Sequence, residues 1–270
     1  MKNFKDLQKN NQRLIKRREK LLEKEYIKAF KELDITLRDV YDRYEVDGQL
    51  NLDELYKYNR MKKLEKNTSK IVAGLYAGLD KIINKTLKEI LETTEKESKT
   101  IINGRESVVP ITKKLNKKDL INKSVAGRKW QERTKHHKDN FIYDTQTVIR
   151  KSMEDGDTYT TMAKNLKEKI NKEVRKPKDI VRSEGHRIQE ESKYEVMEEV
   201  GGKVKMTKTW NSVGDSRVRD THQIMDGTTI GIDEEFVLPS GDLALYPGNS
   251  GNAAEDINCR CFLTYDVVEE

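Results

Sequence analysis

The chain has 270 residues, of which 34% are hydrophobic and 37% are charged. Globular domains average roughly 45–50% apolar and about 25% charged residues, so this composition indicates a thin core and favours elongated helices over a compact globule. The N-terminal residues lack the apolar segment of a secretory signal, and the longest uncharged stretch of the first half, 71–79, is shorter than the roughly 20 residues of a membrane span, so we expect neither secretion by that route nor a membrane span.

Charge is divided unevenly along the chain. From Trp210 to Glu270 there are three basic and twelve acidic residues, a net charge of −9, whereas residues 1–209 carry 50 basic and 35 acidic residues, a net charge of +15. A Lys-rich helical portion attracts polyanions by counterion release, and an acidic portion is repelled by them. If nucleic acid is a partner, we expect residues 1–209 to contact it. The plain alternative is that Lys and Glu interleave on solvated helical faces.

Segment 4–44 has the pattern of a long amphipathic helix. Its apolar residues recur at spacings of three, four and seven, and no Pro or Gly interrupts them. Leu7, Leu14 and Leu21 form a heptad series, but the alternate seam positions are polar or charged. We therefore expect this helix to pack against neighbouring helices rather than to form a two-stranded coiled coil.

A second long helix follows a turn. The run VDGQLNLDEL supplies the turn at its Asp-Gly pair, and Asn51 or Asp53 is available to cap the next helix. The helical pattern resumes over 71–91, and a polar stretch that ends at Pro110 breaks it. The sequence therefore predicts a hairpin of helical arms as a first domain, over 1–110.

Shorter helices are expected in the second domain, over 111–202. Their predicted ranges are 130–153, 159–174 and 179–200. Pro177 indicates a turn before the last of them, and the pair Gly201-Gly202 is a strong stop signal at its end.

The pattern changes to a period of two beyond residue 202. The run VKMTKTWN alternates as a strand does, and so does INCRCFLTYDV near the C-terminus. Between them, Asp215 is expected to cap a short helix over 216–226 that Gly227 closes, followed by short strands and turns over 228–246. Residues 203–270 are thus predicted to form a small mixed module, and the fold class is α+β with helical arms first.

Several short motifs in this module occur in one order. They are Trp210, the run from Asp215 through Arg219 to His222, the pair Asp226-Gly227, the pair Pro247-Gly248 after Tyr246, and the run Asn258-Cys259-Arg260-Cys261. The ordered set resembles the phage minor head protein family, the head morphogenesis family typified by protein F of phage Mu. The resemblance covers roughly residues 125–267, and we expect these motif residues to be structural.

The resemblance implies a function in assembly. It implies a minor capsid protein of a tailed phage that is incorporated into the procapsid, with the portal protein and other capsid or scaffold proteins as partners. It also implies a role with double-stranded DNA in genome packaging or ejection, without sequence specificity. The expected location is the capsid interior of the virion, after assembly in the host cytoplasm.

The two cysteines suggest two readings of their neighbourhood. Cys259 and Cys261 are too close in sequence for an ordinary disulfide, which makes a reducing compartment the simpler assumption. Period two places both thiols on the apolar face of their strand, and the helical pattern turns His222 toward the core. These three side chains are candidate zinc ligands, with Asp220 or Asp226 as a fourth. The sequence favours simple packing of the three side chains and no cofactor, with zinc as the alternative.

The sequence gives little support to an enzyme. No nucleophile with an adjacent base, phosphate-binding glycine loop or carboxylate cluster with metal spacing is recognisable. Glu184 and His186 lie close in one helical stretch and could form a catalytic pair. We expect instead that Glu184 forms a structural ion pair with an arginine of the C-terminal module. Two alternatives remain open: a metal-dependent nuclease-like or toxin module, and a DNA-binding helical protein unrelated to phage.

Overall fold

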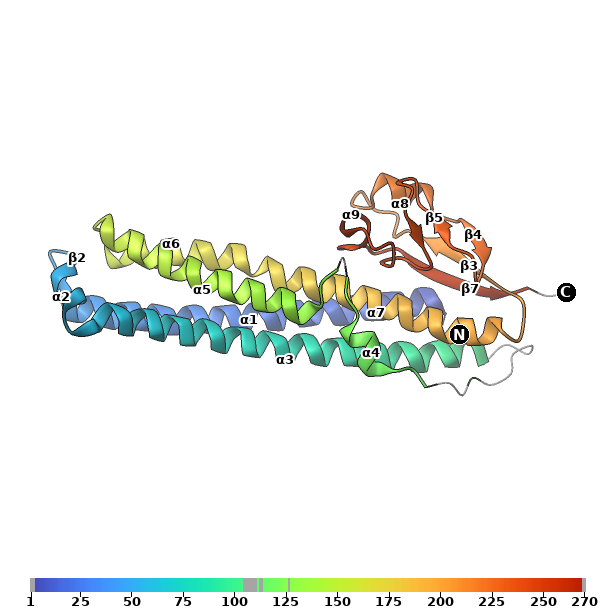
Figure 1. Cartoon of the computed structure of the whole chain (residues 1–270), viewed down its shortest axis with the longest axis horizontal. Coiled ribbons are helices and arrows are strands. Elements are labelled where there is room, and N and C mark those ends of the chain that lie inside the picture. The colour runs from blue at the N-terminus through green and yellow to red at the C-terminus, as the bar shows by residue number, and fades with distance from the viewer. Residues whose placement is uncertain (1–2, 104–110, 112–113, 126, 269–270) are drawn as a thin grey trace. The chain divides into compact units, whose positions relative to one another are not determined.

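The computed structural model describes residues 3–103, 111, 114–125 and 127–268 (Figure 1). The helical elements are α1 (Phe4–Tyr44), α2 (Leu52–Tyr56), the 3-10 turn η1 (Lys57–Asn59), α3 (Arg60–Asn103), α4 (Lys117–Asn122), α5 (Trp130–Glu154), α6 (Tyr159–Glu173), α7 (Arg175–Gly201), α8 (Asp220–Ile224) and α9 (Ala253–Asp256). The strands are β1 (Glu45–Val46), β2 (Gln49–Leu50), β3 (Met206–Asn211), β4 (Thr229–Gly231), β5 (Phe236–Val237), β6 (Leu243–Ala244) and β7 (Phe262–Val267). Long helices precede a small module of strands and short helices, so the predicted α+β class is confirmed.

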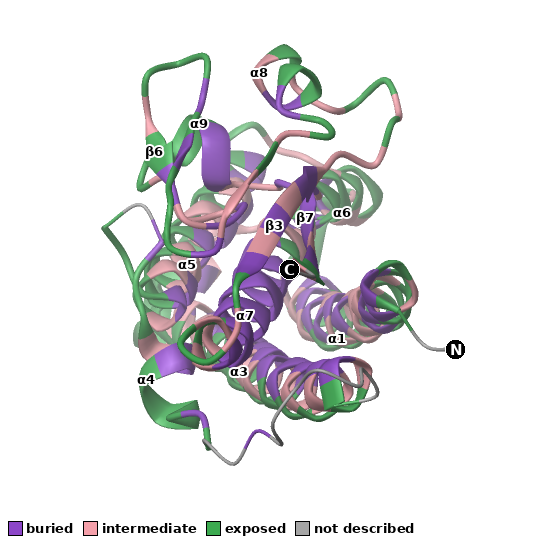
Figure 2. Ribbon diagram, turned by 90° about the vertical axis from the view of Figure 1, so that its right-hand side faces the viewer, coloured by how far each residue is buried: buried purple, intermediate pink, exposed green. Residues whose placement is uncertain are grey.

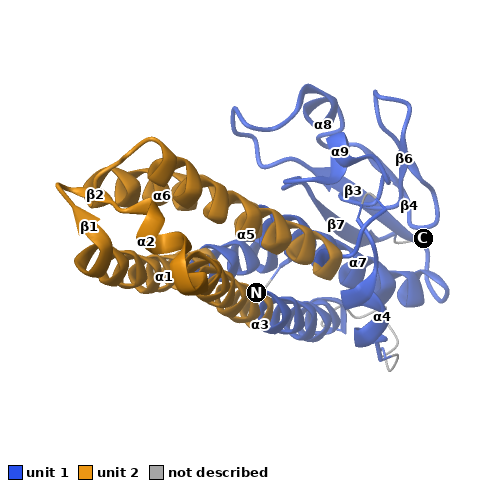
Figure 3. Cartoon of the chain, turned by 60° about the vertical axis from the view of Figure 1, so that its left-hand side comes forward, with its two compact units in different colours: residues 1–18, 83–130, 179–270 blue, residues 19–82, 131–178 orange. Residues whose placement is uncertain are grey.

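The chain divides into two compact units (Figure 3). Unit 1 comprises residues 1–18, 83–130 and 179–270, and unit 2 comprises residues 19–82 and 131–178. The boundaries between them fall inside helices α1, α3, α5 and α7. The sequence-based division into 1–110, 111–202 and 203–270 follows chain segments instead, and it stays a prediction.

Unit 2 is a helical bundle with a partly polar core. The hydroxyl of Tyr76 donates to Glu173 Oε1 at 3.0 Å, and the hydroxyl of Tyr26 lies 3.5 Å from that of Tyr76. Both tyrosine rings pack near Phe141, with centroid distances of 6.2 and 6.5 Å. The buried carboxylate therefore has a partner, which burial away from water requires.

The turn between the two long helices has the predicted form. Asp47 and Gly48 have φ values of 50° and 80° and connect the two-residue strands β1 and β2. The Asn51 side chain then accepts the N–H of Glu54 and caps α2. The predicted turn and the cap at Asn51 are confirmed.

A three-stranded antiparallel sheet in the order β4, β3, β7 is the centre of the C-terminal module in unit 1. In β3, buried and half-buried residues alternate, as a period of two requires, and Trp210 lies opposite Leu263 of β7. Figure 2 shows the buried residues that run along β3 and β7 and along the α7 helix. Side chains of α7 contact the backbone of β7 directly, as described below.

Three local expectations are wrong. The short helix spans Asp220–Ile224 rather than 216–226, and Asp215 does not cap it, since Arg219 occupies the N-cap position without a side-chain bond. Pro177 lies in the first turn of α7, where the helix needs no N–H from it, instead of in a turn before the helix. The last strand begins at Phe262, because Asn258 has a φ of 58° that interrupts extended backbone.

Most of the polar connection predicted over 102–110 lies outside the described residues, since α3 continues to Asn103 and 104–110 are not described. Among the helices that are described, none combines the length and the apolar composition needed to cross a bilayer.

Candidate functional site

The motif residues around β3, α8 and the loop before β7 pack together in unit 1. The Trp210 ring meets the His222 ring edge-on at 5.5 Å and the Phe236 ring at 5.2 Å. Gly227, with a φ of 80°, donates its N–H to the carbonyl of Trp210 at 2.9 Å, so the end of α8 is tied to the end of β3. Motifs that are separate in sequence therefore form one packed group.

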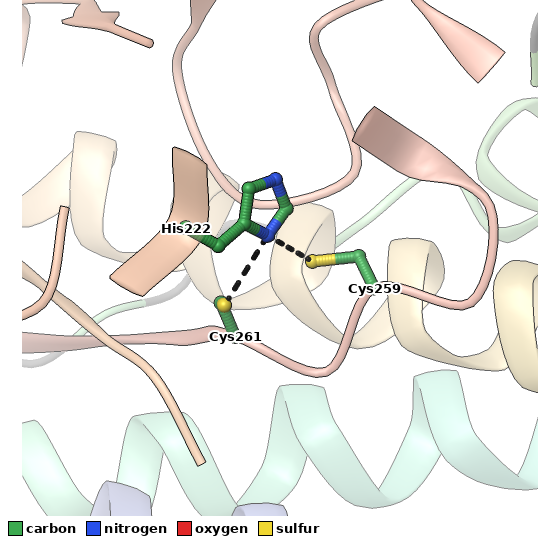
Figure 4. A group of neighbouring side chains, drawn as sticks. All are labelled: His222, Cys259 and Cys261. Atoms are coloured by element: carbon green, nitrogen blue, oxygen red, sulfur yellow. Dashed lines mark hydrogen bonds between the residues drawn. The ribbon is translucent and has the colours of Figure 1, made fainter. Parts of the chain in front are cut away.

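His222, Cys259 and Cys261 converge at the centre of this group (Figure 4). His222 Nδ1 lies 3.5 Å from Cys259 Sγ and 3.4 Å from Cys261 Sγ. One ligand atom from each residue fits within 4.8 Å of the others, and each residue is only 2% exposed. The sequence thus identified three side chains that the fold brings to one point.

The other nitrogen of the His222 ring faces a carboxylate. His222 Nε2 lies 2.8 Å from Glu255 Oε2, and the Thr221 hydroxyl donates to the same oxygen at 3.0 Å. Glu255 is a buried residue of α9, whose first turn is capped by the Asn252 side chain. This contact lacks hydrogen-bond geometry, so the carboxylate acts on the ring through its charge. A negative charge beside one ring nitrogen favours the tautomer with its proton there and leaves Nδ1 as the acceptor or ligand.

The two thiols differ in their electrostatics. A hydrogen bond from Cys259, together with His222 and Trp210, lowers the pKa of the Cys261 thiol. The same hydrogen bond and burial raise the pKa of Cys259 well above its usual range. The first proton to leave the pair therefore leaves a thiolate at Cys261, which accepts from its neighbours.

The two aspartates considered as a fourth ligand have other surroundings. Asp220 is exposed in the first turn of α8. Asp226 is also exposed, and its Oδ1 accepts the N–H of Ser212 at 2.6 Å. Neither belongs to the cluster of three ligand atoms among the described residues. Sequence reasoning missed Glu255, although its position four residues before Cys259 in the same motif segment was a usable signal.

An ion pair holds the loop that carries the cysteines. Arg260, between them, donates to both oxygens of Asp215 at 2.6 and 2.5 Å, and Arg219 donates to the carbonyl of Ile257. The Arg260 guanidinium holds the pKa of Asp215 well below its usual range. The motif residues Asp215 and Arg219 thus fix the loop rather than the helix end.

The same loop is attached to α7. Asn258 donates its backbone N–H to Ser183 Oγ at 3.0 Å. The turn at Pro247-Gly248 packs on the same helix, because a Cβ on Gly248 would lie 3.6 Å from Cδ2 of His186. Burial, with a contribution from Lys193, lowers the pKa of His186 to about 3. His186 is therefore a neutral core residue at neutral pH.

Charged residues of α7 clamp strand β7. Glu190 Oε2 accepts the N–H of Leu263 at 2.9 Å, and Lys193 Nζ donates to the Leu263 carbonyl at 3.1 Å. The two side chains also pair with each other at 2.8 Å, and both are completely buried. Burial raises the pKa of Glu190 and lowers that of Lys193. These charges, which sequence reasoning missed, take the place of a neighbouring strand.

Glu184 forms an ion pair inside α7, whereas the predicted partner was an arginine of the C-terminal module. Arg187, three residues along, lies 3.1 Å from the Glu184 carboxylate and also pairs with Glu191. Arg187 further donates to the carbonyl of Leu120 in α4 at 2.8 Å. The partner found for Glu184 thus belongs to α7, and the network joins α7 to α4.

A basic surface hollow lies on the part of α1 that belongs to unit 1. It is lined by Asn10, Arg13, Lys16 and Arg17, all exposed. Spacings of three and four place the three cations on one face of the helix. Within the described residues, none of the three forms an ion pair, so their charge is available to an anion.

Comparison with known proteins identifies relatives of this chain. Residues 143–264 match the family described as Phage Mu protein F like protein. The chain is 26% identical over 275 residues to the minor head protein GP7 of Bacillus phage SPP1, an alignment that covers 99% of this chain and 88% of that protein. No solved structure matches the chain significantly.

A second relative is a larger enzyme. The chain is 32% identical over 154 residues to the NAD(+)--arginine ADP-ribosyltransferase EFV of Enterococcus faecalis, which covers 56% of this chain and 31% of that protein. This chain therefore spans about a third of that relative. Residues 143–264 thus match the Phage Mu protein F-like family, and the motif resemblance is confirmed.

Proposed function

We propose that this chain is a minor head protein of a tailed phage, built into the procapsid and retained in the virion head. The observation that carries the proposal is the similarity to the SPP1 minor head protein along nearly the full length of both chains. Because the alignment covers 99% of this chain, the proposal includes the long N-terminal helices as well as the family region at 143–264.

The partners in this proposal are the portal protein and other capsid or scaffold proteins. The test is co-expression of this chain with the portal and capsid proteins of the same phage, followed by sedimentation of the assembled procapsids. We expect the chain to sediment with procapsids that contain portal and to be depleted when the portal is left out. Equal amounts in both preparations would argue against portal association, and absence from both would argue against the head role.

A second part of the proposal is contact with the packaged DNA. The basic hollow of α1 offers three cations that form no ion pair with the described part of the chain, and residues 1–209 carry a net charge of +15. Neutralising phosphates with such cations releases counterions, so affinity falls as salt rises. Contact with the phosphate backbone alone would also give the expected lack of sequence specificity.

The experiment compares two triple variants of the full chain with equal net charge. The first replaces Arg13, Lys16 and Arg17 by Gln, and the control replaces Lys28, Arg43 and Lys57 by Gln, which are exposed cations already paired with acids. We expect the first variant to lower the slope of log affinity against log salt by up to about 3, and the control to lower it much less. Equal losses would show that net charge, not this hollow, governs binding.

The enzyme relative supplies a second candidate function. The ADP-ribosyltransferase activity is that of the longer protein, and the expectation that this chain is not an enzyme stays a prediction. Incubation of the full chain with labelled NAD⁺ and an arginine-rich acceptor tests for ADP-ribose transfer, and incubation with DNA and divalent metal tests the nuclease alternative. We expect neither product, and either product would favour the corresponding enzyme.

A further inference from the structure

The arrangement of His222, Cys259 and Cys261 is unusual for side chains that only pack. A single nitrogen, Nδ1, lies at nearly equal distances of 3.4 and 3.5 Å from two sulfurs. An imidazole nitrogen carries either one hydrogen or one lone pair, so it makes one good hydrogen bond. Hydrogen bonding therefore accounts for one of these contacts and leaves the second unexplained.

A tetrahedral metal ion accounts for both contacts. With zinc–sulfur bonds of about 2.3 Å and a zinc–nitrogen bond of about 2.0 Å, the nitrogen and each sulfur lie about 3.5 Å apart across a tetrahedral edge. The two observed distances agree with this value, and the three ligand atoms all lie within 4.8 Å of one another. The three donors are thus already spaced for a metal.

The surroundings also suit a metal. Glu255 stands 2.8 Å behind the outer ring nitrogen of His222, where outer carboxylates orient metal-binding histidines. The indole nitrogen of Trp210, a buried residue, lies beside Cys261. A metal-bound thiolate is an acceptor for that donor.

Charge balance favours a dication at this point. Two thiolates and a neutral imidazole give a charge of −2, which one Zn²⁺ cancels inside a region that is almost fully buried. Soft sulfur and imidazole ligands select zinc over magnesium or calcium, which prefer oxygen.

We propose that His222 Nδ1, Cys259 Sγ and Cys261 Sγ bind a zinc ion and fasten helix α8 to the loop before β7. Three ligands come from the described residues, and a water completes the tetrahedron. Glu255 is a positioning residue that acts through His222. The sequence alone favours packing of these side chains, and the nearly equal distances from His222 Nδ1 to the two sulfurs are the observation that favours the metal.

The test is metal analysis of the full chain purified without chelator from zinc-supplemented culture. We expect about one zinc ion per chain, and we expect cobalt added to the metal-free protein to give thiolate-to-cobalt charge-transfer absorption. The wild-type measurements decide the question even where a variant does not fold. Substoichiometric zinc of less than about a tenth per chain, with no such cobalt absorption, would overturn the proposal and leave simple packing.

Variants then assign the ligands. Cys259→Ala and His222→Gln should lose most of the bound zinc, whereas Met225→Leu, a change at the buried residue that follows α8, should retain it. Glu255→Gln should keep the ligands and weaken zinc affinity by about 10-fold to 100-fold, because it removes the partner of the ring. Zinc content in the two ligand variants equal to that of Met225→Leu would refute the assignment.

Discussion

Lys208 presents a buried charge whose cost can be worked out from its surroundings. It lies on the inward face of β3 between Met206 and Trp210, and it is 0% exposed. Its Nζ has no hydrogen-bond partner among the described residues, although it lies 4.8 Å from the Tyr194 ring centroid and 5.5 Å from that of Phe236. Burial lowers the pKa of Lys208 to about 8, against an ordinary value of 10.5, while the acid side chains nearby, chiefly Asp233, raise it.

The cost follows from this pKa. A tenfold change in protonation is worth about 1.4 kcal/mol, so a fall from 10.5 to about 8 corresponds to about 3 kcal/mol of lost stability at pH 7. Cation–π attraction to the two aromatic rings offsets about 0.5–2 kcal/mol of this cost. Met has a similar shape and packs well against aromatic rings. We therefore expect Lys208→Met to raise the free energy of unfolding at pH 7 by about 1–3 kcal/mol.

The direction in which the free energy of unfolding changes with pH provides a sharper check. Between pH 8 and 10.5 the unfolded chain keeps the Lys208 proton and the folded chain has lost it, so the stability of the wild type rises with pH. The advantage of Lys208→Met should shrink by about 2 kcal/mol between pH 7 and 9.5, measured by urea unfolding at both values. Lys205→Met, a change at the exposed residue directly before β3, is the control and should stay within about 0.5 kcal/mol of the wild type. A Lys208→Met variant that is less stable at pH 7, with a difference independent of pH, would refute the reasoning.

Three further predictions concern unit 1 and one control helix, each measured by urea unfolding. Gly227→Ala should destabilise by about 1 kcal/mol, because Gly227 has a φ of 80°, whereas Gly74→Ala, in an open helical position of α3, should stabilise by about 0.5–1 kcal/mol; equal effects would contradict this. Between pH 6.5 and 4.5 the wild type should lose about 2 kcal/mol more stability than His186→Gln, because the low pKa of His186 means that only the unfolded chain takes up its proton there. An equal loss of stability in both proteins over this pH range would count against the prediction. Lys193→Met should cost about 3–5 kcal/mol by leaving Glu190 buried without its cation, and adding Glu190→Met should recover much of the loss. A double variant no more stable than Lys193→Met alone would contradict this.

Elements with a strong period could be predicted from the sequence. The helix over 4–44 has its predicted limits, because the apolar stripe is uninterrupted and the following Asp-Gly pair takes positive φ values. The inward position of His222 also followed from its spacing to Val218 and Met225, and it is only 2% exposed. Local spacing fixed these features without long-range contacts.

Features that depend on distant partners could not be predicted. Asp215 is a good capping residue by type, yet its carboxylate pairs with Arg260, 45 positions away, so the helix begins later than its sequence suggests. Glu190 and Lys193 have the composition of a solvated helical face, and only the approach of β7 makes them buried partners of a strand. The sequence gives the residues at such sites, but tertiary contacts decide their roles.

The Glu190 and Lys193 clamp also bears on the behaviour of the sheet in crowded surroundings. In the order β4, β3, β7, the last strand is at an edge, and an unpaired edge is a template for strand addition by another molecule. At Leu263 the outward N–H and carbonyl of that edge are both already engaged by a helix of the same chain. Head proteins assemble at high local concentration, where exposed sheet edges can pair between molecules. Because the backbone groups of Leu263 are already bonded, the edge at that point resists both edge-to-edge aggregation and the binding of other extended peptides.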